Sequence, residues 1–382
     1  MLGDDVPLKH PLLNAGVLGS DSVMSAVFQG RVYWFWGDTN RGSYPLGNFH
    51  VPGATSELPA NGGLAVFDGI DLDYFVGDDG FAKETCRMPG DGPTWIDGLV
   101  TVGDGDRQRM FAKYVKIRPP LDVYERGIVE FNDDTKQFEH RLTLDAELPL
   151  VPEGHAFPAS KSGEPNGRDY IYFANPYPVV RVPATADALL NPDQYEAWTC
   201  FAPGERGTDA KLDRDADGTL RVGWKRGTRA VDQKLEKQLL ASGLLKPEER
   251  FFRFTDANGD RSVTAHRGSV AFNAYRNCWI MIFMESFGEH SSLGDVWYAE
   301  SDAITGPWEQ AARIVTHDKY SFYNPKHHPI FDEENGRVIY FEGTYTRTFS
   351  GTDTATPRYD YNQVMYRLNL DDPRLATARK AE

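Results

Sequence analysis

One pattern recurs about five times along this chain and limits what it can fold into. It is a run of β-branched and aromatic residues that opens with Arg or with a turn residue. Each run has the length of a strand and is almost continuously apolar, which is typical of strands covered on both faces. The runs are Gly30–Asp38, Arg109–Tyr114, Arg168–Asn175, Arg276–Glu285 and Gly336–Glu342.

A shorter, more polar strand is expected before each aromatic run, and a third strand after it. The expected first strands are Ser20–Phe28, Pro93–Val102, Gly154–Ala159, His266–Ala274 and Tyr323–Phe331. The expected third strands are Gly63–Tyr74, Gly127–Phe138, Val179–Pro183 or Tyr195–Phe201, Asp295–Trp308, and Gln363–Leu370. Recurring clusters of short strands favour an all-β, five-bladed β-propeller over a β-sandwich, which does not predict a five-fold recurrence.

The spacing between aromatic runs is longer from the third to the fourth. The extra stretch, about 204–265, contains a helical pattern with apolar residues at Val231, Leu235, Leu239 and Leu240, and Gly243 is a plausible stop signal. We expect residues 1–382 to form a single propeller domain with this partly helical insertion on one face. The insertion is interpreted either as a lid or as a surface decoration.

Composition agrees with this fold and excludes some functions. Aromatic residues make up 13% of the chain, with 36 Gly and 24 Pro, which suits short strands joined by tight turns. The net charge of -15 argues against a nucleic-acid partner. No apolar run approaches the ~20 residues that span a bilayer, so no membrane partner is expected. The three cysteines are too few for a disulfide framework.

Two segments resemble parts of five-bladed glycoside hydrolases of the family 43 and family 32 type. Leu293–Trp308 carries Ala-Glu-Ser-Asp followed by Gly-Pro-Trp, which resembles a blade of these enzymes. Gly19-Ser-Asp21 followed by Gly30-Arg-Val-Tyr-Trp-Phe resembles their first blade, although the family's Arg-Asp-Pro is replaced by Ser20-Asp21-Ser22. The ending, with Tyr323–Pro329, Tyr340–Tyr345 and Pro357–Gln363, resembles uncharacterised bacterial propeller proteins.

The resemblance implies an enzyme that hydrolyses glycosidic bonds in a polysaccharide or oligosaccharide. It implies a role in polysaccharide degradation and a periplasmic or extracellular location. No signal peptide is visible in the sequence, and a protein whose leader has been removed would read the same way. We expect a monomer or a small homo-oligomer with a saccharide as its partner.

Polar residues on the expected first strands should meet on the propeller axis. They are Asp21, Asp97, His155, His266 with Arg267, and His327 with His328. The chain has only 9 His, so this grouping is informative. Three of the imidazoles, His155, His266 and His328, are candidate ligands for an axial Ca²⁺, Zn²⁺ or Mn²⁺, although hydrolysis itself would need no cofactor. The alternatives are acid–base chemistry and hydrogen bonding to backbone groups.

Carboxylates are the second group with catalytic potential, because glycoside hydrolysis uses a carboxylic acid and a carboxylate. We predict Asp21 and Asp97 as general base or charge-tuning partner, and Glu285 and Glu342 as general acids. Predicted substrate contacts are Asp38, Trp36, Arg41, Trp95, Tyr114, Arg181 and Arg267. The alternative for the aromatic residues is a place in the core between blades.

Two other functions fit the same residues. A polysaccharide lyase would use a His or Tyr base, with an Arg on the uronate carboxylate. A non-catalytic glycan-binding propeller would need none of the axial carboxylates for its function.

Overall fold

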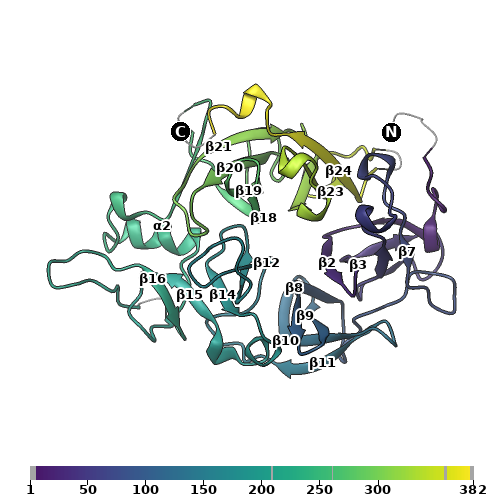
Figure 1. Cartoon of the computed structure of the whole chain (residues 1–382), viewed down its shortest axis with the longest axis horizontal. Helices are drawn as coiled ribbons and strands as arrows, with labels where there is room; N and C mark the ends of the chain where they lie inside the picture. The colour runs from purple at the N-terminus through teal and green to yellow at the C-terminus, as the bar shows by residue number, and fades with distance from the viewer. Residues whose placement is uncertain (1–5, 208–209, 260, 357–358, 379–382) are drawn as a thin grey trace.

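The computed structural model describes residues 6–207, 210–259, 261–356 and 359–378. Pro357 and Arg358 of the terminal motif therefore lie outside the described residues, as do the two ends of the predicted domain. The protein is all-β, as predicted, and strands grouped around a common centre dominate it (Figure 1). In the described part, no helix is long and apolar enough to cross a membrane.

Within these residues the strands form six sheets, built mainly of antiparallel neighbours. Five of the sheets are large, and the sixth is small. The first of the five contains β2 (Met24–Phe28), β3 (Arg31–Phe35), β6 (Gly53–Ser56) and β7 (Asp73–Tyr74). The second contains β8 (Thr94–Asp104), β9 (Arg107–Arg118), β10 (Asp122–Asn132) and β11 (Gln137–Thr143). The third contains β12 (His155–Ala159), β13 (Tyr170–Ala174), β14 (Val180–Pro183), β15 (Glu196–Thr199) and β16 (Gly223–Arg226).

The fourth sheet contains β18 (Ala265–Asn273), β19 (Cys278–Glu285), β20 (Val296–Ser301) and β21 (Trp308–Val315), with β17 (Phe252–Asp256) added in parallel to β21. The fifth contains β22 (Ser321–His327), β23 (Val338–Thr346) and β24 (Asn362–Asn369). A small sixth sheet is made of β1 (Val17–Ser20), β4 (Thr39–Arg41) and β5 (Gly47–Asn48), and β1 contacts β24.

Helices are few in the part of the chain that is described. The α-helices are α1 (Ala186–Leu189) and α2 (Gln233–Ala241). Short 3-10 helices lie in the connections at Asn14–Gly16, Pro59–Asn61, Val66–Asp68, Pro192–Gln194, Pro247–Glu249, Pro329–Phe331, Glu334–Gly336 and Pro373–Leu375.

The aromatic runs of the sequence are the second strands of the five larger sheets, β3, β9, β13, β19 and β23, as predicted. The expected first strands are confirmed as β2, β8, β12, β18 and β22. One third strand was predicted wrongly, at Gly63–Tyr74. The third strand of that sheet is β6, while Val66–Asp68 forms a 3-10 helix and only Asp73–Tyr74 pairs, as an outer strand. The residues of β6 are small and lack the aromatic signal of the other strands.

The five first strands form a ring of contacts at the centre of the molecule. Going round it, β2 contacts β8, β8 contacts β12, β12 contacts β18, and β18 contacts β22. The Lys326 ammonium of β22 donates to the Ser25 carbonyl oxygen of β2 over 2.8 Å, which joins the fifth sheet back to the first. These inner strands bring segments some 300 residues apart into contact.

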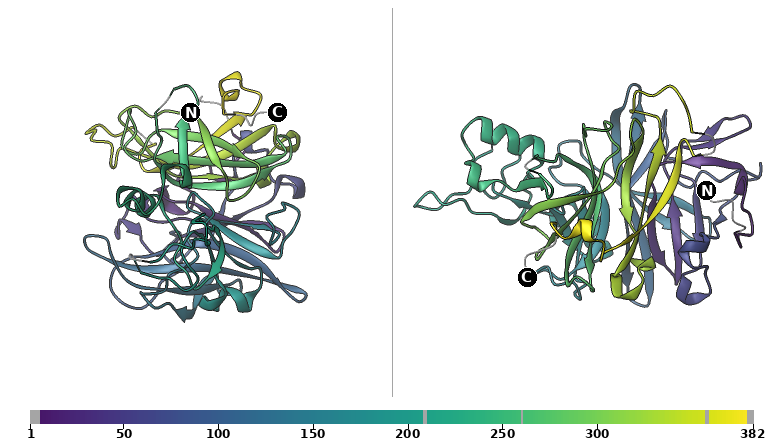
Figure 2. Two further views of the ribbon diagram at one scale, coloured as in Figure 1. Left: turned by 90° about the vertical axis from the view of Figure 1, so that its left-hand side faces the viewer. Right: turned by 90° about the horizontal axis from the view of Figure 1, so that it is seen from above.

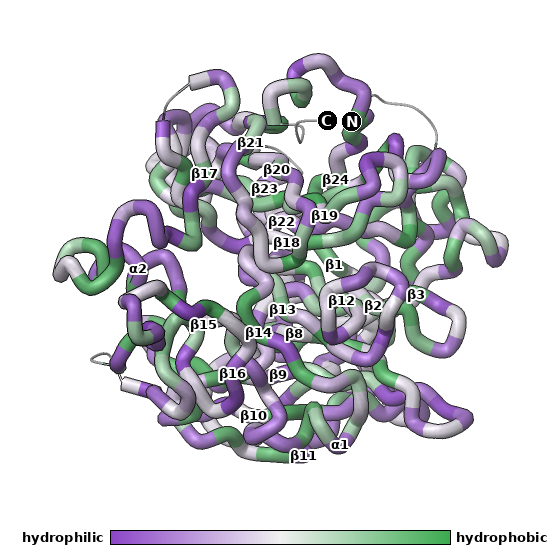
Figure 3. Tube along the Cα trace, turned by 60° about the vertical axis from the view of Figure 1, so that its left-hand side comes forward, coloured by the Kyte–Doolittle hydropathy of each residue, from purple (hydrophilic) through white to green (hydrophobic). Residues whose placement is uncertain are grey.

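Hydrophobic packing follows the same ring. Among the described residues there are five buried clusters, and each joins two neighbouring sheets, the last of them the fifth sheet to the first. Figure 3 accordingly shows hydrophobic stretches spread over all the sheets rather than gathered in one. Face-to-face packing of neighbouring sheets is what the near-continuous apolar strands require, since both of their faces are covered.

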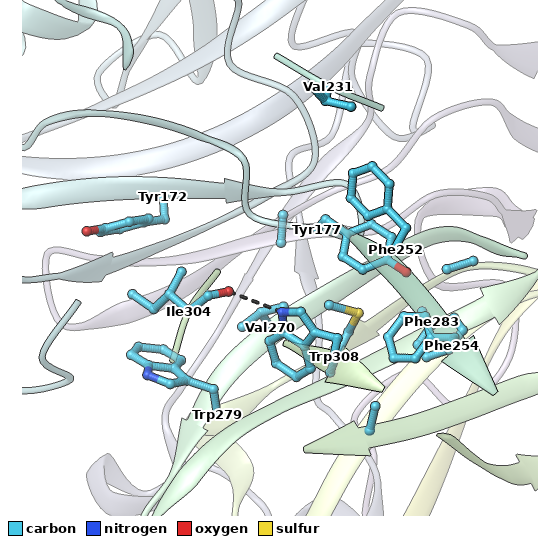
Figure 4. Close-up of a cluster of buried hydrophobic side chains, with 14 of the residues drawn as sticks. Tyr172, Tyr177, Val231, Phe252, Phe254, Val270, Trp279, Phe283, Ile304 and Trp308 are labelled. Carbon is cyan, nitrogen blue, oxygen red and sulfur yellow. Dashed lines mark hydrogen bonds between the residues drawn. The ribbon is translucent and has the colours of Figure 1, made fainter. Parts of the chain in front are cut away.

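Helix α2 confirms the helical pattern of the sequence and packs against the third and fourth sheets. Its residues Leu235 and Leu239 are buried in the hydrophobic cluster between these sheets. Figure 4 shows Tyr177, Phe252 and Trp308 of the same cluster. The Asp232 side chain caps the helix by accepting from the Leu235 N–H. In the right-hand view of Figure 2, the teal segment that carries α2 projects from one side of the molecule.

Candidate active site

One end of the inner strands encloses a cavity of about 530 Å³, which we call the axial cavity. It is lined by residues of all five larger sheets. Its ionisable side chains are Asp21, Asp97, Lys113, Glu153, His155, His266 and Arg267, and its aromatic side chains are Trp36, Trp95, Tyr323 and Phe349. The structure therefore brings together seven of the residues predicted from the first strands or as substrate contacts: Asp21, Trp36, Trp95, Asp97, His155, His266 and Arg267.

Irregular strand pairing aims these residues at the cavity. The register shifts between Asp97 and Val100 in β8, and between His266 and Gly268 in β18. It shifts again in β22, between Tyr323 and Lys326. Arg267 has a positive φ of 46° at its shift, an uncommon backbone state for a residue with a side chain. β-Bulges commonly redirect side chains next to active sites, and here three of them meet at one cavity.

Asp21 lies in the turn before β2. Its carboxylate accepts hydrogen bonds from the hydroxyls of Tyr323 (2.8 Å) and Tyr361 (3.1 Å). Burial, and after it the nearby carboxylate of Asp38, raises the pKa of Asp21 to about 6. Gly37 is required here, because a Cβ at that position would lie 2.1 Å from Oδ1 of Asp21. Asp21 can therefore hold a proton close to neutral pH.

Asp38 does not line the cavity, but it contacts Trp95, which does. Its Oδ1 accepts a hydrogen bond of 2.8 Å from the indole N–H of Trp95, and burial raises its pKa. Trp95 itself is partly exposed and lines the cavity, whereas Trp36 is 5% exposed and stacks on Trp34. Trp95 is thus the more accessible aromatic face for a ligand.

Asp97 has the opposite electrostatic setting. Burial alone would raise its pKa, but the charges of Arg267 and Lys113 and the N–H of Gly154 lower it overall. Its Oδ1 accepts from the N–H groups of Gly98 (2.9 Å) and Gly154 (2.8 Å), and its Oδ2 lies 3.2 Å from Nη1 of Arg267. Every oxygen has a partner, so Asp97 is a fixed negative charge.

Glu153 is a third carboxylate of the cavity, directly before β12. Its Oε1 lies 2.5 Å from the ammonium of Lys113, which is itself buried. The Glu153 side chain is 45% exposed, so part of the carboxylate stays accessible to water in the cavity. The sequence interpretation did not select Glu153 or Lys113.

His155 lies at the middle of the axis. It lines the axial cavity and also a second cavity of about 600 Å³ at the opposite end of the inner strands, which we call the distal cavity. Its Nδ1 is buried without a hydrogen-bond partner in the described structure. Burial, and next the charge of Lys326, lowers the pKa of His155 well below its usual value, so the ring is neutral at pH 7.

The distal cavity has a different lining. Its lining includes the apolar residues Val100, Val270 and Trp279 and the polar residues Lys326 and His328, but no Asp or Glu of the described residues. Burial lowers the pKa of Lys326 to about 7. His328 thus lies at the other end of the axis from Asp21, and its Nε2 is 2.7 Å from Oε1 of Glu342.

The two glutamates predicted as general acids do not line the axial cavity. Glu285 is 2% exposed, pairs through both oxygens with Arg261, and accepts a hydrogen bond of 3.1 Å from the indole of Trp297. Glu342 is 6% exposed and faces His328 near the distal end. Both carboxylates have close partners within the protein.

Four predicted substrate contacts also lie outside the lining of the axial cavity: Asp38, described above, and Arg41, Arg181 and Tyr114. Arg41 pairs with Asp79 at 2.5 Å and lies over the ring of Phe81. Arg181 is buried, pairs with Glu196 and stacks on Trp224. Tyr114 is 1% exposed, and its hydroxyl donates to Glu125 over 2.8 Å. Their observed contacts are structural, and their contact with a substrate stays a prediction.

The three predicted metal ligands are divided between the two cavities. His155 and His266 line the axial cavity, and His328 lines the distal one. Over residues 6–378, apart from the few positions not described, no group of three or more His, Cys, Asp or Glu side chains could hold a metal ion. An axial metal therefore stays a prediction of the sequence.

Comparisons with known proteins found only distant structural similarity. No protein-family model matches the sequence, and no curated protein matches it. An exo-β-1,3-galactanase from Phanerochaete chrysosporium has a TM-score of 0.44 at 8% identity over 93% of this chain, which spans 61% of that enzyme. An exo-1,5-α-L-arabinanase from a bovine ruminal metagenomic library has a TM-score of 0.45 at 10% identity, over 93% of this chain and 95% of the other.

A family 43 β-1,3-galactosidase has a TM-score of 0.41 at 7% identity, over 92% of this chain and 56% of that one. The solved structures similar to this chain thus include enzymes of the family that its sequence resembles. Since every one of these TM-scores is below 0.5, the functional argument depends on the residues of the axial cavity.

Proposed function

We propose that this protein is a glycoside hydrolase and that the axial cavity is its active site. One observation carries the proposal: a single cavity holds carboxylates in opposite electrostatic settings. Burial raises the pKa of Asp21 to about 6, while Arg267 keeps Asp97 ionised. Hydrolysis of a glycosidic bond needs one carboxyl group that carries a proton and another that is ionised. The raised pKa of Asp21 supports the first of these roles for it, and the charge of Asp97 shows that the same cavity also keeps a carboxylate ionised.

The accessibility of the three carboxylates assigns the roles in more detail. Asp21 is the general acid that protonates the leaving oxygen, because it keeps its proton closest to neutral pH. Glu153 is the second catalytic carboxylate, since its side chain is 45% exposed and its ion pair among the described residues is with Lys113. Asp97 is a charge-tuning partner whose oxygens are all occupied. Asp21 thus takes the role that the sequence interpretation gave to Glu285 and Glu342.

The shape of the cavity supports an oligosaccharide or the end of a polysaccharide as the substrate. Its volume of about 530 Å³ is in the usual range for small-ligand sites. The partly exposed indole of Trp95 offers an apolar face on which a sugar ring can stack.

The same proposal includes the architecture and the location. The ring of inner strands and the five clusters between neighbouring sheets support a five-bladed propeller, with the small sheet of β1, β4 and β5 as an addition. We infer a single domain, with residues of about 204–265 as an insertion that adds β16, α2 and β17. A polysaccharide-degrading role would place the protein in the periplasm or outside the cell.

The test uses the purified protein and a panel of neutral and acidic polysaccharides and oligosaccharides, with release of reducing ends as the readout. Asp21→Asn and Glu153→Gln should each lower kcat/KM by about 10²- to 10⁴-fold without loss of folding, as expected for an acid or base group. Asp106→Asn, at an exposed turn of the same sheet as Asp97, is the matched control and should leave activity unchanged.

Other outcomes would change the assignment. Products that absorb in the near ultraviolet would contain a new C=C bond and identify a polysaccharide lyase instead. Saturable binding without turnover of any glycan would indicate a glycan-binding protein. Full activity of both variants would overturn the roles given to Asp21 and Glu153.

A further inference from the structure

A groove of about 470 Å³ lies beside helix α2. Its walls come from two parts of the chain. One wall is formed by Gln233, Lys234, Lys237, Gln238 and Ala241 of α2, and the other by Thr264, Ala265, His266 and Ser286 next to the fourth sheet. The two walls are joined where the Gln233 amide donates to the Ala265 carbonyl oxygen over 3.2 Å. We call this surface the α2 groove.

The helix presents two different faces because of its periodicity. Leu235, Glu236 and Leu239 are buried on the side of the core. Lys234 and Lys237, spaced by three residues, lie on the other side and are exposed. Because Leu235 and Leu239 pack against the core, the helix presents Lys234 and Lys237 on its opposite side, where they line the α2 groove.

The charge of the α2 groove is not compensated. No carboxylate lines it. In the described part of the chain, neither Lys234 nor Lys237 takes part in an ion pair, whereas the cations of the axial cavity do: Arg267 with Asp97, and Lys113 with Glu153. A local positive surface on a protein with a net charge of -15 attracts an anionic ligand that the rest of the molecule repels.

The α2 groove and the axial cavity share one lining residue. His266 lines both of them. Partial burial, and next the charge of Arg267, lowers the pKa of His266, so its ring adds a neutral hydrogen-bonding group between the two sites at pH 7. A chain-like ligand that leaves the axial cavity past His266 therefore meets the two lysines of α2.

We propose that the α2 groove binds an acidic sugar unit, carrying a carboxylate or a sulfate ester, of a glycan whose scissile bond lies in the axial cavity. This inference depends on the glycosidase function proposed above and names the class of its substrate. The two ammonium groups bind the anionic group, while Gln233, Gln238 and Ser286 offer hydrogen bonds to the sugar hydroxyls. Helix α2 then acts as a specificity element and not as surface decoration.

The test measures binding to the inactive Asp21→Asn protein by calorimetry at low ionic strength. The probes are oligogalacturonate, an oligosaccharide of a sulfated galactan, and a neutral β-1,4-galactan oligosaccharide of the same length. At least one acidic probe should bind more tightly than the neutral one. In the Asp21→Asn background, Lys234→Gln with Lys237→Gln should weaken that acidic probe about fivefold, in line with exposed charge pairs, and leave the neutral probe unchanged. The difference should shrink in 0.5 M salt.

The matched control is Lys161→Gln with Lys211→Gln, which removes the same charge at exposed positions outside the three cavities. This control should bind all probes as before. The proposal is overturned if neither acidic probe is preferred, or if both double variants weaken the acidic probe equally. If wild-type protein hydrolyses neutral glycans with no dependence on Lys234 and Lys237, the groove proposal fails and the glycosidase function stands. If no glycan is hydrolysed, the glycosidase function fails.

Discussion

The two ends of the five inner strands form two cavities of similar size from the same elements, yet their chemistry differs. The axial cavity holds three carboxylates, two of them paired with cations. No carboxylate of the described residues lines the distal cavity, and the Lys326 ammonium there donates to a backbone carbonyl. His155 belongs to both. The composition of each strand does not explain the contrast, because one strand contributes to both ends.

Strand pairing explains it better. The register of β8, β18 and β22 shifts at the axial end, while their pairing beyond Val100, Gly268 and Lys326 is regular. A regular strand places successive side chains on alternate faces. A bulge interrupts this alternation at the cost of ladder hydrogen bonds. The reactive groups thus gather where the sheets give up regular pairing.

The strongest test of the contrast is the close approach of Gly37 to Asp21. In Gly37→Ala, a Cβ would lie 2.1 Å from Oδ1 of Asp21, so the carboxylate must move. We expect kcat/KM to fall by about 100-fold, as for displacement of a catalytic group by about 1 Å. Gly103→Ala is the control at the distal cavity, because its Cβ would meet no atom within 4 Å. Equal activity of the two variants would contradict the catalytic position of Asp21.

A second test uses the pH dependence of stability. The pKa of Asp21 is raised on folding, so its contribution to the free energy of unfolding is complete below about 4 and is lost as pH rises through about 6. Asp21→Asn removes this loss. Its stability relative to wild type should improve by about 2 kcal/mol from pH 4 to pH 7.5 in chemical denaturation. A constant difference across this range, like that expected of Asp106→Asn, would show that Asp21 titrates normally.

The smallest effect is expected at the distal cavity. Lys326→Met removes its cation but no group that contacts the proposed substrate, so kcat/KM should change less than twofold. The pKa of Lys326 is lowered to about 7, and the folded protein therefore favours the neutral amine. The variant should also be at least as stable as wild type at pH 6, where the buried lysine would otherwise carry its charge. A large loss of activity would show that the two ends are functionally coupled.

Much of the fold could be predicted from the sequence, because the aromatic runs and the polar strands before them mark the two inner positions of each sheet. The outer strands were less predictable. Gly53–Ser56 has small residues and no periodic apolar signal, and it is a strand because it pairs with β3. Of the two alternatives for the third strand of the third sheet, Val179–Pro183 is confirmed, because β14 pairs with β13, while Tyr195–Phe201 contains the fourth strand, β15.

The site was predictable only in part for the same physical reason. Asp21, Asp97 and Arg267 stand out as polar residues at the ends of inner strands. Glu285 and Glu342 stand out equally well at strand ends. In the structure, however, Glu285 is hydrogen-bonded to Arg261, and Glu342 lies next to His328. The sequence does not reveal these partners. Glu153 was missed although it directly precedes Gly154-His155, a position next to an expected inner strand.

The hydroxyls that hold Asp21 come from far along the chain, and this has a consequence for how the protein matures. Tyr323 lies 302 residues after Asp21, and Tyr361 lies 340 residues after it. During synthesis, Asp21 leaves the ribosome long before either tyrosine exists. If Asp21 has the proposed catalytic role, we expect the nascent protein to stay inactive until its fifth sheet is complete, and proteolytic removal of that sheet to abolish activity.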